Sequence, residues 1–339
     1  MLRKPLFYLT LLTFTFFGSA AYFLSTQSTT APHFKYVTGH LSVINSAPPA
    51  DLTFCDTPVP LDKPHVKSLL EREIARQLEG YNGTLLTFQR ANRYQDEFLS
   101  IMNEMGVPED FFYLVIAESN LSNASSPAGA QGFWQFMHAA ATMYGLEISE
   151  TVDERYHPEK STVAACRYLK NAYEDFGDWA LVAASYNMGN GGLSQAIKAQ
   201  GTRDYYDLKL NRETGHYLYR ILAYKSIMEA PERYGIAVSN RQLFQPIPYR
   251  AIKVQENIPD LASFAQQHGT DYATLKLLNP WLIASRLDIT PGKTYEIRLP
   301  AGNYMHASEL RVQRPASADS MAAPVEPQPQ TLLSSIPEA

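Results

Sequence analysis

The chain of 339 residues has only two cysteines, Cys55 and Cys166, and its eight histidines are scattered. No Cys-x-x-Cys pair or histidine cluster supplies the ligand spacing of a zinc site, so we expect neither a metal nor another cofactor. Two isolated thiols are favoured over a disulfide, which an exported protein would permit. The chain also lacks a basic stretch, and its formal net charge is −5. We expect no nucleic-acid partner, because binding phosphates requires clustered positive charge.

One uncharged stretch, residues 5–24, follows Arg3 and Lys4. A positive start before an apolar run is typical of a secretory signal or a membrane anchor. The small residues at 18–21 (Gly-Ser-Ala-Ala) offer a cleavage site, while the length of the run approaches that of a bilayer-spanning helix. Cleavage and retention both stay open. We expect an exported protein of the periplasm or cell envelope, with membrane attachment through residues 5–24 as one alternative.

Composition divides the rest of the chain. Residues 25–60 are rich in Ser, Thr and Pro, which predicts a linker or a loosely packed arm. Residues 61–235 carry apolar side chains at helical spacing and predict a mainly α domain. Residues 236–250 read as a second linker, and residues 251–300 as a small β-α-α-β module. Residues 301–339 have too little apolar content to fold and are predicted to be disordered.

The predicted helices end at glycines or begin at capping residues, as helices commonly do. In the larger domain they span residues 62–78, 84–94, 96–105, 108–118, 138–144, 158–176, 179–186 and 213–230. In the module, strands at 251–254 and 294–299 flank helices at 258–268 and 272–279.

Glu118 is the most informative residue, because it closes a helix that is otherwise apolar from Phe111 to Ala117. The spacing places Glu118 on one face with Leu114 and Val115. Burial and the negative end of the helix dipole both oppose ionisation, so we expect the pKa of Glu118 to be raised. A carboxyl group that stays protonated near neutral pH suits a general acid, and the aromatic and amide residues that follow indicate cleavage of a sugar polymer. An exposed glutamate at a helix end is the alternative.

Four short motifs follow one another in the larger domain. They are Glu118-Ser119, residues 126–137 (SPAGAQGFWQFM), residues 185–189 (SYNMG) and residues 213–217 (ETGHY). In this order they resemble the catalytic domain of lytic transglycosylases, most closely the membrane-bound murein transglycosylase D type with its goose-lysozyme-like α fold. Met188 stands where the family has a small residue, and His138-Ala139 replaces Pro and Ser/Thr. Neither departure removes a group that the chemistry needs.

The resemblance implies cleavage of the β-1,4 bond between N-acetylmuramic acid and N-acetylglucosamine in peptidoglycan strands. The C6 hydroxyl of the muramic residue would attack its own anomeric carbon and leave a 1,6-anhydro ring. Glu118 would protonate the leaving oxygen and then take the proton of the C6 hydroxyl. Hydrolytic glycosidases generally use two carboxylates, and no second one lies close to Glu118 in the sequence. A distant Asp or Glu could still fold into place as the second carboxylate. Two other functions stay open: a hydrolytic β-1,4-muramidase and a non-catalytic cell-wall-binding protein. Protein partners are unknown from the sequence.

The same resemblance implies substrate-binding residues around the acid. Gln135 would hold a sugar N-acetyl or hydroxyl group through its amide. Tyr186 and Asn187 would line the cleft and position the N-acetyl group, and Tyr217 would steady either the acid or that group. Ser119 would hydrogen-bond the acid or the substrate, with a helix cap as the equal alternative.

For four neighbouring residues we favour a role outside substrate binding, or consider it at least as well supported. Phe133 and Trp134 could stack on a sugar, but aromatic residues beside a helix are more often core, and we favour core for both. Glu213, at a helix start, is at least as well explained by capping. His216 is expected to be solvated.

The module at residues 251–300 resembles a diverged LysM repeat. The resemblance rests on Ile252-Lys253-Val254, Leu278-Asn279-Pro280 and Pro291-Gly292-Lys293, while Glu256-Asn257-Ile258-Pro259 replaces the usual Gly-Asp-Thr-Leu. Intact repeats bind N-acetylglucosamine stretches of peptidoglycan. A module that has lost this binding and keeps only a structural role is the alternative.

Overall fold

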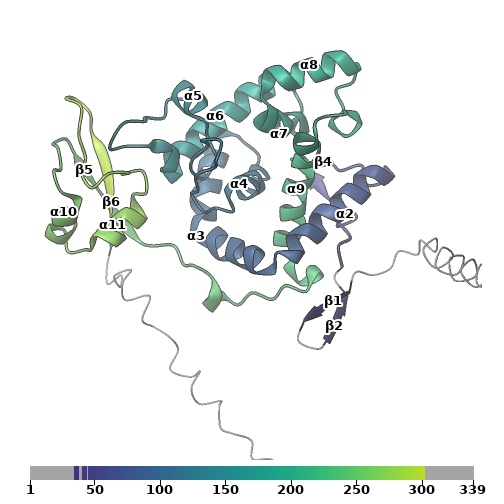
Figure 1. Cartoon of the computed structure of the whole chain (residues 1–339), viewed down its shortest axis with the longest axis horizontal. Coiled ribbons are helices and arrows are strands. Elements are labelled where there is room, and N and C mark those ends of the chain that lie inside the picture. The colour runs from purple at the N-terminus through teal and green to yellow at the C-terminus, as the bar shows by residue number, and fades with distance from the viewer. Residues whose placement is uncertain (1–33, 38–39, 44, 302–339) are drawn as a thin grey trace, which may run out of the picture. The chain divides into compact units, whose positions relative to one another are not determined.

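The structure is a computed structural model that describes residues 34–37, 40–43 and 45–301 (Figure 1). The expected signal or anchor, and the expected tail beyond its first residue, lie outside the described residues. Within them, no helix combines the length and the apolar character needed to cross a membrane. The chain divides into two compact units, and residues Glu150–Val152 belong with the second, which otherwise begins at Ile247.

The first unit is mainly helical, as predicted. Its helices are α2 (Pro64–Glu79), α3 (Tyr81–Met105), α4 (Phe111–Ser119), α5 (His138–Met143), α6 (Pro158–Phe176), α7 (Trp179–Met188), α8 (Asn190–Gln200) and α9 (Arg212–Glu229). Four 3-10 helices, η1 (Glu154–Tyr156), η2 (Tyr205–Asp207), η3 (Pro231–Tyr234) and η4 (Asn240–Gln242), join or follow them. Two antiparallel hairpins precede the helices, β1 (Phe34–Val37) with β2 (His40–Val43) and β3 (Thr53–Phe54) with β4 (Thr57–Pro58).

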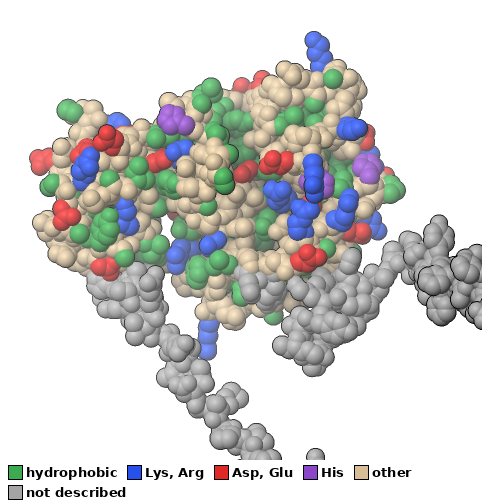
Figure 2. Space-filling view, in the orientation of Figure 1, with side chains coloured by type: hydrophobic (Ala, Val, Ile, Leu, Met, Phe, Trp, Pro, Cys, Tyr) green, Lys and Arg blue, Asp and Glu red, His purple; other side chains and the backbone are tan. Residues whose placement is uncertain are grey.

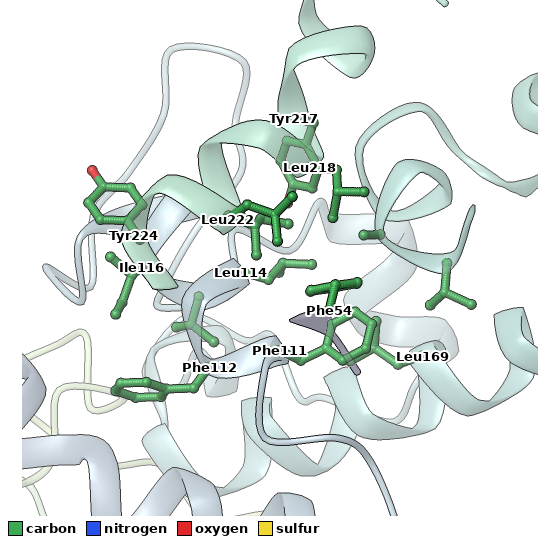
Figure 3. Close-up of a cluster of buried hydrophobic side chains, with 14 of the residues drawn as sticks. Phe54, Phe111, Phe112, Leu114, Ile116, Leu169, Tyr217, Leu218, Leu222 and Tyr224 are labelled. Carbon is green, nitrogen blue, oxygen red and sulfur yellow. The ribbon is translucent and has the colours of Figure 1, made fainter. Parts of the chain in front are cut away.

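Helix α4 is buried on nearly every side. Its side chains from Phe111 to Ile116, apart from half-buried Tyr113, are at most 2 % exposed. Leu114 and Ile116 lie beside Leu218 and Leu222 of α9 in the core of the unit (Figure 3). Each fully buried side chain of this kind stabilises the fold by about 1.5–3 kcal/mol. Because α4 is enclosed in this way, Glu118 in its last turn has a fixed position against α9.

Two helix predictions need correction. The predicted helices at 84–94 and 96–105 form one continuous helix, α3, because no glycine or proline separates them. Helix α8 was not predicted at all, since Asn190-Gly191-Gly192 reads as a loop. It forms behind Gly189, whose φ of 81° breaks the chain direction after α7, and buried Leu193 fixes it to the core.

The expected linker at residues 25–60 is wrong for residues 45–60, which are packed. Leu52, Phe54 and Val59 are at most 6 % exposed, and the ring of Phe54 lies 5.6 Å from that of Phe111. The backbone N–H of Cys55 donates to Oδ2 of Asp110 at 2.6 Å. The composition correctly indicates a segment with little regular structure, but three spaced apolar side chains are enough to dock it. Cys55 and buried Cys166 are both free thiols.

The second unit has the predicted β-α-α-β order. It contains β5 (Tyr249–Val254), α10 (Leu261–Gln267), α11 (Tyr272–Leu278) and β6 (Tyr295–Pro300). The two strands pair antiparallel, with Tyr249 opposite Pro300 and Val254 opposite Tyr295. Buried Asn279 donates to the carbonyl of Arg298 at 2.7 Å and accepts from its N–H at 2.8 Å, so the end of α11 is fixed to β6.

Candidate active site

Glu118 lies at the last turn of α4 and is half-buried. Burial raises the pKa of Glu118 from 4.5 to about 7, against the lowering effects of a Tyr217 hydrogen bond and the Arg220 charge. The negative charge of Glu213 adds to the increase. Oε2 of Glu118 accepts no hydrogen bond from the residues that the structure describes. One carboxyl oxygen is therefore held by the protein, and the other is left for a second partner.

Tyr217 holds the first oxygen. Its hydroxyl donates to Oε1 of Glu118, and its side chain is only 1 % exposed. Burial, followed by the charge of Glu118, raises the pKa of Tyr217 well above its usual value, so the phenol stays a donor. The predicted role of steadying the acid therefore has a geometric basis. Tyr217 was found in the sequence as part of a motif, although 99 residues separate it from Glu118.

The end of α7 is tied to the start of α9 through Asn187. Its amide nitrogen donates to Oε1 of Glu213 at 3.2 Å, and its amide oxygen accepts from the hydroxyl of Thr214 at 2.7 Å. The helix cap itself is Asn211, which accepts from the backbone N–H of Thr214 at 2.9 Å. Glu213 lies in the first turn of α9, where its charge suits the positive end of the helix dipole as expected, and Asn187 also directs its carboxylate.

The loop after α4 folds back onto the helix end. The hydroxyl of Ser119 donates to the carbonyl of Phe133 at 2.8 Å, and no hydrogen bond joins it to the carboxyl of Glu118 among the described residues. Gln135 has a φ of 51°, and its amide nitrogen donates to the carbonyls of Ala124 and Gly132 at 2.9 and 2.8 Å. Both side chains therefore shape the loop, while Oε1 of Gln135 accepts no bond from the described residues.

Gly132 makes this loop possible. Its φ is 83°, and a Cβ there would lie 1.8 Å from the carbonyl oxygen of Arg155. Only glycine tolerates both the left-handed conformation and this approach. The glycine in the second motif is therefore needed for the local fold.

Aromatic side chains of the second and third motifs pack against each other. Phe133 and Trp134 are 0 % exposed, which confirms the expectation that both belong to the core. The hydroxyl of Tyr186 donates to the carbonyl of Trp134 at 2.7 Å. Burial, followed by the charge of Glu118, raises the pKa of Tyr186 well above its usual value, which places this residue in the electrostatic environment of the acid.

Sequence reasoning missed Arg220 of α9, whose charge acts on Glu118, and the pairing of His216 with Glu73 of α2. The expectation that His216 is solvated is wrong: its Nδ1 lies 2.9 Å from Oε1 of Glu73, a residue of α2 that is 1 % exposed. Arg220 and Glu213 act on the charge of Glu118 from α9. Helical spacing places Glu213 and Arg220 on the face of α9 that carries Tyr217, which was the available signal. No group of three metal-ligating side chains is found within the described ranges.

Comparison with known proteins agrees with the motifs. Residues 78–209 match the transglycosylase SLT domain, and residues 250–303 match the soluble lytic transglycosylase C-terminal LysM-like domain. The chain therefore contains these two domains, as its resemblances predict. The first match includes Glu118, Gln135, Tyr186 and Asn187 but ends before Tyr217.

The individual proteins that resemble this chain share less than 30 % of their residues with it. Membrane-bound lytic murein transglycosylase D of Escherichia coli K12 is 29 % identical over 229 residues, which cover 66 % of this chain and 49 % of the relative. The chain thus spans about half the length of the curated relatives that it matches. Among solved structures, the 70 kDa soluble lytic transglycosylase of Escherichia coli aligns over 45 % of this chain and 27 % of its own, with 22 % identity and a TM-score of 0.34. An inactive variant of lytic transglycosylase Slt from Pseudomonas aeruginosa aligns over 45 % and 26 %, with 18 % identity and a TM-score of 0.33.

Proposed function

We propose that this chain is a peptidoglycan lytic transglycosylase with Glu118 as its single acid and base. The observation that carries this proposal is a half-buried carboxyl group in an SLT domain, with a pKa raised to about 7 and one oxygen held by Tyr217. A group with such a pKa is available in both protonation states near neutral pH, as a residue that first gives and then takes a proton requires.

In the first step Glu118 donates its proton to the glycosidic oxygen as the bond from that oxygen to C1 of the muramic residue breaks. The oxygen without a protein partner, Oε2, is the one that faces the sugar. The hydroxyl of Tyr217 stabilises the carboxylate that results, because it donates to Oε1.

In the second step the C6 hydroxyl of the muramic residue attacks C1, and the carboxylate of Glu118 accepts its proton. The products are a 1,6-anhydro ring and a free 4-hydroxyl group on N-acetylglucosamine, so no water is consumed. Gln135 presents Oε1 to a donor of the sugar, Tyr186 lines the cleft beneath the acid, and Ser119 and Asn187 hold the loop and the Glu213 carboxylate in place.

A hydrolytic muramidase is the second candidate, and Glu213 favours it. The sequence places no second carboxylate close to Glu118, but the fold brings the charge of Glu213 to act on it. A carboxylate beside the acid is what activation of a water molecule would need. Glu213 is exposed and bonded by Asn187, which is compatible with such a role.

Mass analysis of the muropeptides released from purified sacculi separates the two reactions. We expect anhydro-muramic ends with the native protein and with Glu213→Gln, and no products with Glu118→Gln. Reducing muramic ends that disappear in Glu213→Gln would instead establish hydrolysis. Activity that survives Glu118→Gln unchanged would leave only the non-catalytic binding role.

Localisation and the role of the second unit follow from the same proposal. A peptidoglycan substrate requires export to the cell envelope, and a retained N-terminal anchor agrees with the words "membrane-bound" in the name of the relative. We propose that the LysM-like module binds the glycan. Co-sedimentation of sacculi with the full chain and with a chain ending at Pro246 tests this, and equal binding would leave the module a structural role only.

A further inference from the structure

One face of helix α9 packs against the end of α4, and this face carries Tyr217, Arg220 and Tyr224. The hydroxyl of Tyr217 donates to Glu118, and the hydroxyl of Tyr224 donates to Oδ1 of Asn120 at 2.8 Å. Figure 3 shows both tyrosines on the same helix above α4. Arg220 lies between them, three residues after Tyr217 and four before Tyr224. Residues at these spacings share a helix face, so Arg220 faces the end of α4 beside the acid.

Arg220 forms no ion pair among the described residues, although its charge acts on Glu118. Its side chain is half-buried, yet no hydrogen bond or ion pair joins its guanidinium to them. The two nearby carboxylates on α9 and α2 are engaged elsewhere. Glu213 accepts from Asn187, and Glu73 is paired with His216 and lies 3.5 Å from Arg76. A partly buried guanidinium is costly unless an anion compensates it. Glu118 interacts with the charge of Arg220 but forms no ion pair with it, and the pKa of Glu118 is raised to about 7.

The surroundings attract an anion. The chain as a whole is acidic, but Lys and Arg side chains gather with a histidine over α2 and α9 (Figure 2). The exposed members on these two helices include Arg72, Arg76 and Arg212. A negatively charged group that approaches Glu118 therefore passes a cationic surface before it reaches Arg220.

We propose that Arg220 is a specificity-determining subsite that binds a carboxylate of the glycan substrate next to the bond that Glu118 cleaves. The planar guanidinium matches a carboxylate through two parallel hydrogen bonds. This inference rests on the proposed function and adds the recognition of a charged substituent. The muramic residue carries its lactyl ether on C3 of the ring whose C1 is attacked, and one helix turn, about 5 Å, separates Arg220 from the donor to Glu118.

Two sources supply a carboxylate at that place. A strand without stem peptides exposes the lactyl carboxylate itself, whereas in a peptide-bearing strand that group is an amide and the free carboxylates belong to the peptide. The chemistry that Arg220 recognises is the same in both cases.

The test uses the full chain and four substrates. The first is peptide-free glycan, and the second is the same glycan with its lactyl carboxylates converted to methylamides. The third is peptide-bearing glycan, and the fourth is that glycan with its peptide carboxylates converted to methylamides. With the native protein we expect a KM about ten-fold lower for the carboxylate form of peptide-free glycan than for the amide, and Arg220→Gln should abolish this difference. Arg220→Lys should keep part of it, and Arg241→Gln, which removes an exposed charge elsewhere in the first unit, should keep all of it.

If the discrimination appears only between native and amidated peptide-bearing glycan, the peptide is the source of the carboxylate. If Arg220→Gln slows all substrates equally and only shifts the pH profile, Arg220 merely acts on the charge of Glu118 and the proposal is overturned. A native protein that releases anhydro products but ignores substrate charge also overturns it, whereas a native protein without anhydro products refutes the proposed function instead.

Discussion

Glu118 and Glu73 both contact α9, at the adjacent residues Tyr217 and His216, yet their partners differ in charge. Glu118 is held by a neutral phenol, while Glu73 faces His216 and Arg76. Glu73 is also the more deeply buried, and its Oε2 has no hydrogen-bond partner among the described residues. The contact of Glu73 with His216 joins α2 to α9, whereas burial raises the pKa of Glu118 to about 7 and leaves it able to exchange a proton. The difference teaches that depth of burial alone does not mark a catalytic carboxyl group, because the more deeply buried Glu73 is engaged by residues of two helices.

The largest effect should come from exchanging each carboxylate for its amide. Glu118→Gln keeps the shape and the oxygen that accepts from Tyr217 but removes the proton, so the rate should fall by about 10²–10⁴. Glu73→Gln should change the rate by less than about ten-fold, because it contacts no reacting atom. Initial rates of anhydro-muropeptide release measure both. Equal losses in the two variants, with both proteins folded, would break the distinction.

Removing the neutral donor should have a smaller effect. Tyr217→Phe deletes a hydrogen bond to a charged group, worth about 1.5–3 kcal/mol, and should slow the reaction about 10–100-fold. The bond lowers the pKa of Glu118, so its loss should raise that pKa above about 7. The form that donates the proton then persists to higher pH, and the alkaline decline of kcat/KM should move upward. A downward shift would show that Tyr217 does not act on the carboxyl group.

The histidine partner of Glu73 should affect stability rather than rate. His216→Ala removes the contact between α2 and α9 and should lower the free energy of unfolding by about 1–3 kcal/mol. Urea unfolding measures the loss, with His138→Ala on exposed α5 as the matched control. If kcat fell more than about ten-fold in His216→Ala at a pH where the protein remains folded, the histidine would belong to the active site.

The local parts of this arrangement could be predicted from the sequence. Helix α6 has the predicted bounds because Pro158 begins it and Gly177 caps it with a φ of 66°. Glu118 was found at the end of an apolar helix, since its neighbours from Phe111 onward are apolar on nearly every side. Composition and periodicity carry such information within a few turns of chain.

The partners of the acid could not be derived in this way. Glu118 meets Tyr217 across 99 residues, and His216 meets Glu73 across 143 residues. Such contacts depend on how α9 packs between α2 and α4, and a single sequence contains no periodic signal for it. Tyr217 was reached through a family motif, whereas Arg220, Glu73 and the pairing of His216 were not. Ser119 and Asn187 form hydrogen bonds within the protein that the sequence did not predict. The hydroxyl of Ser119 holds the loop after α4, and the amide of Asn187 holds the carboxylate of Glu213.

The most direct test of the account is the titration of the Glu118 carboxyl group itself. Its carbon resonance can be followed by NMR against pH in protein labelled at glutamate carboxyls, and assigned by its absence from Glu118→Gln. Burial should hold the group protonated until a midpoint near 7. A midpoint near 4.5, the value of an ordinary glutamate, would contradict the claim that the fold keeps a proton on Glu118 for catalysis.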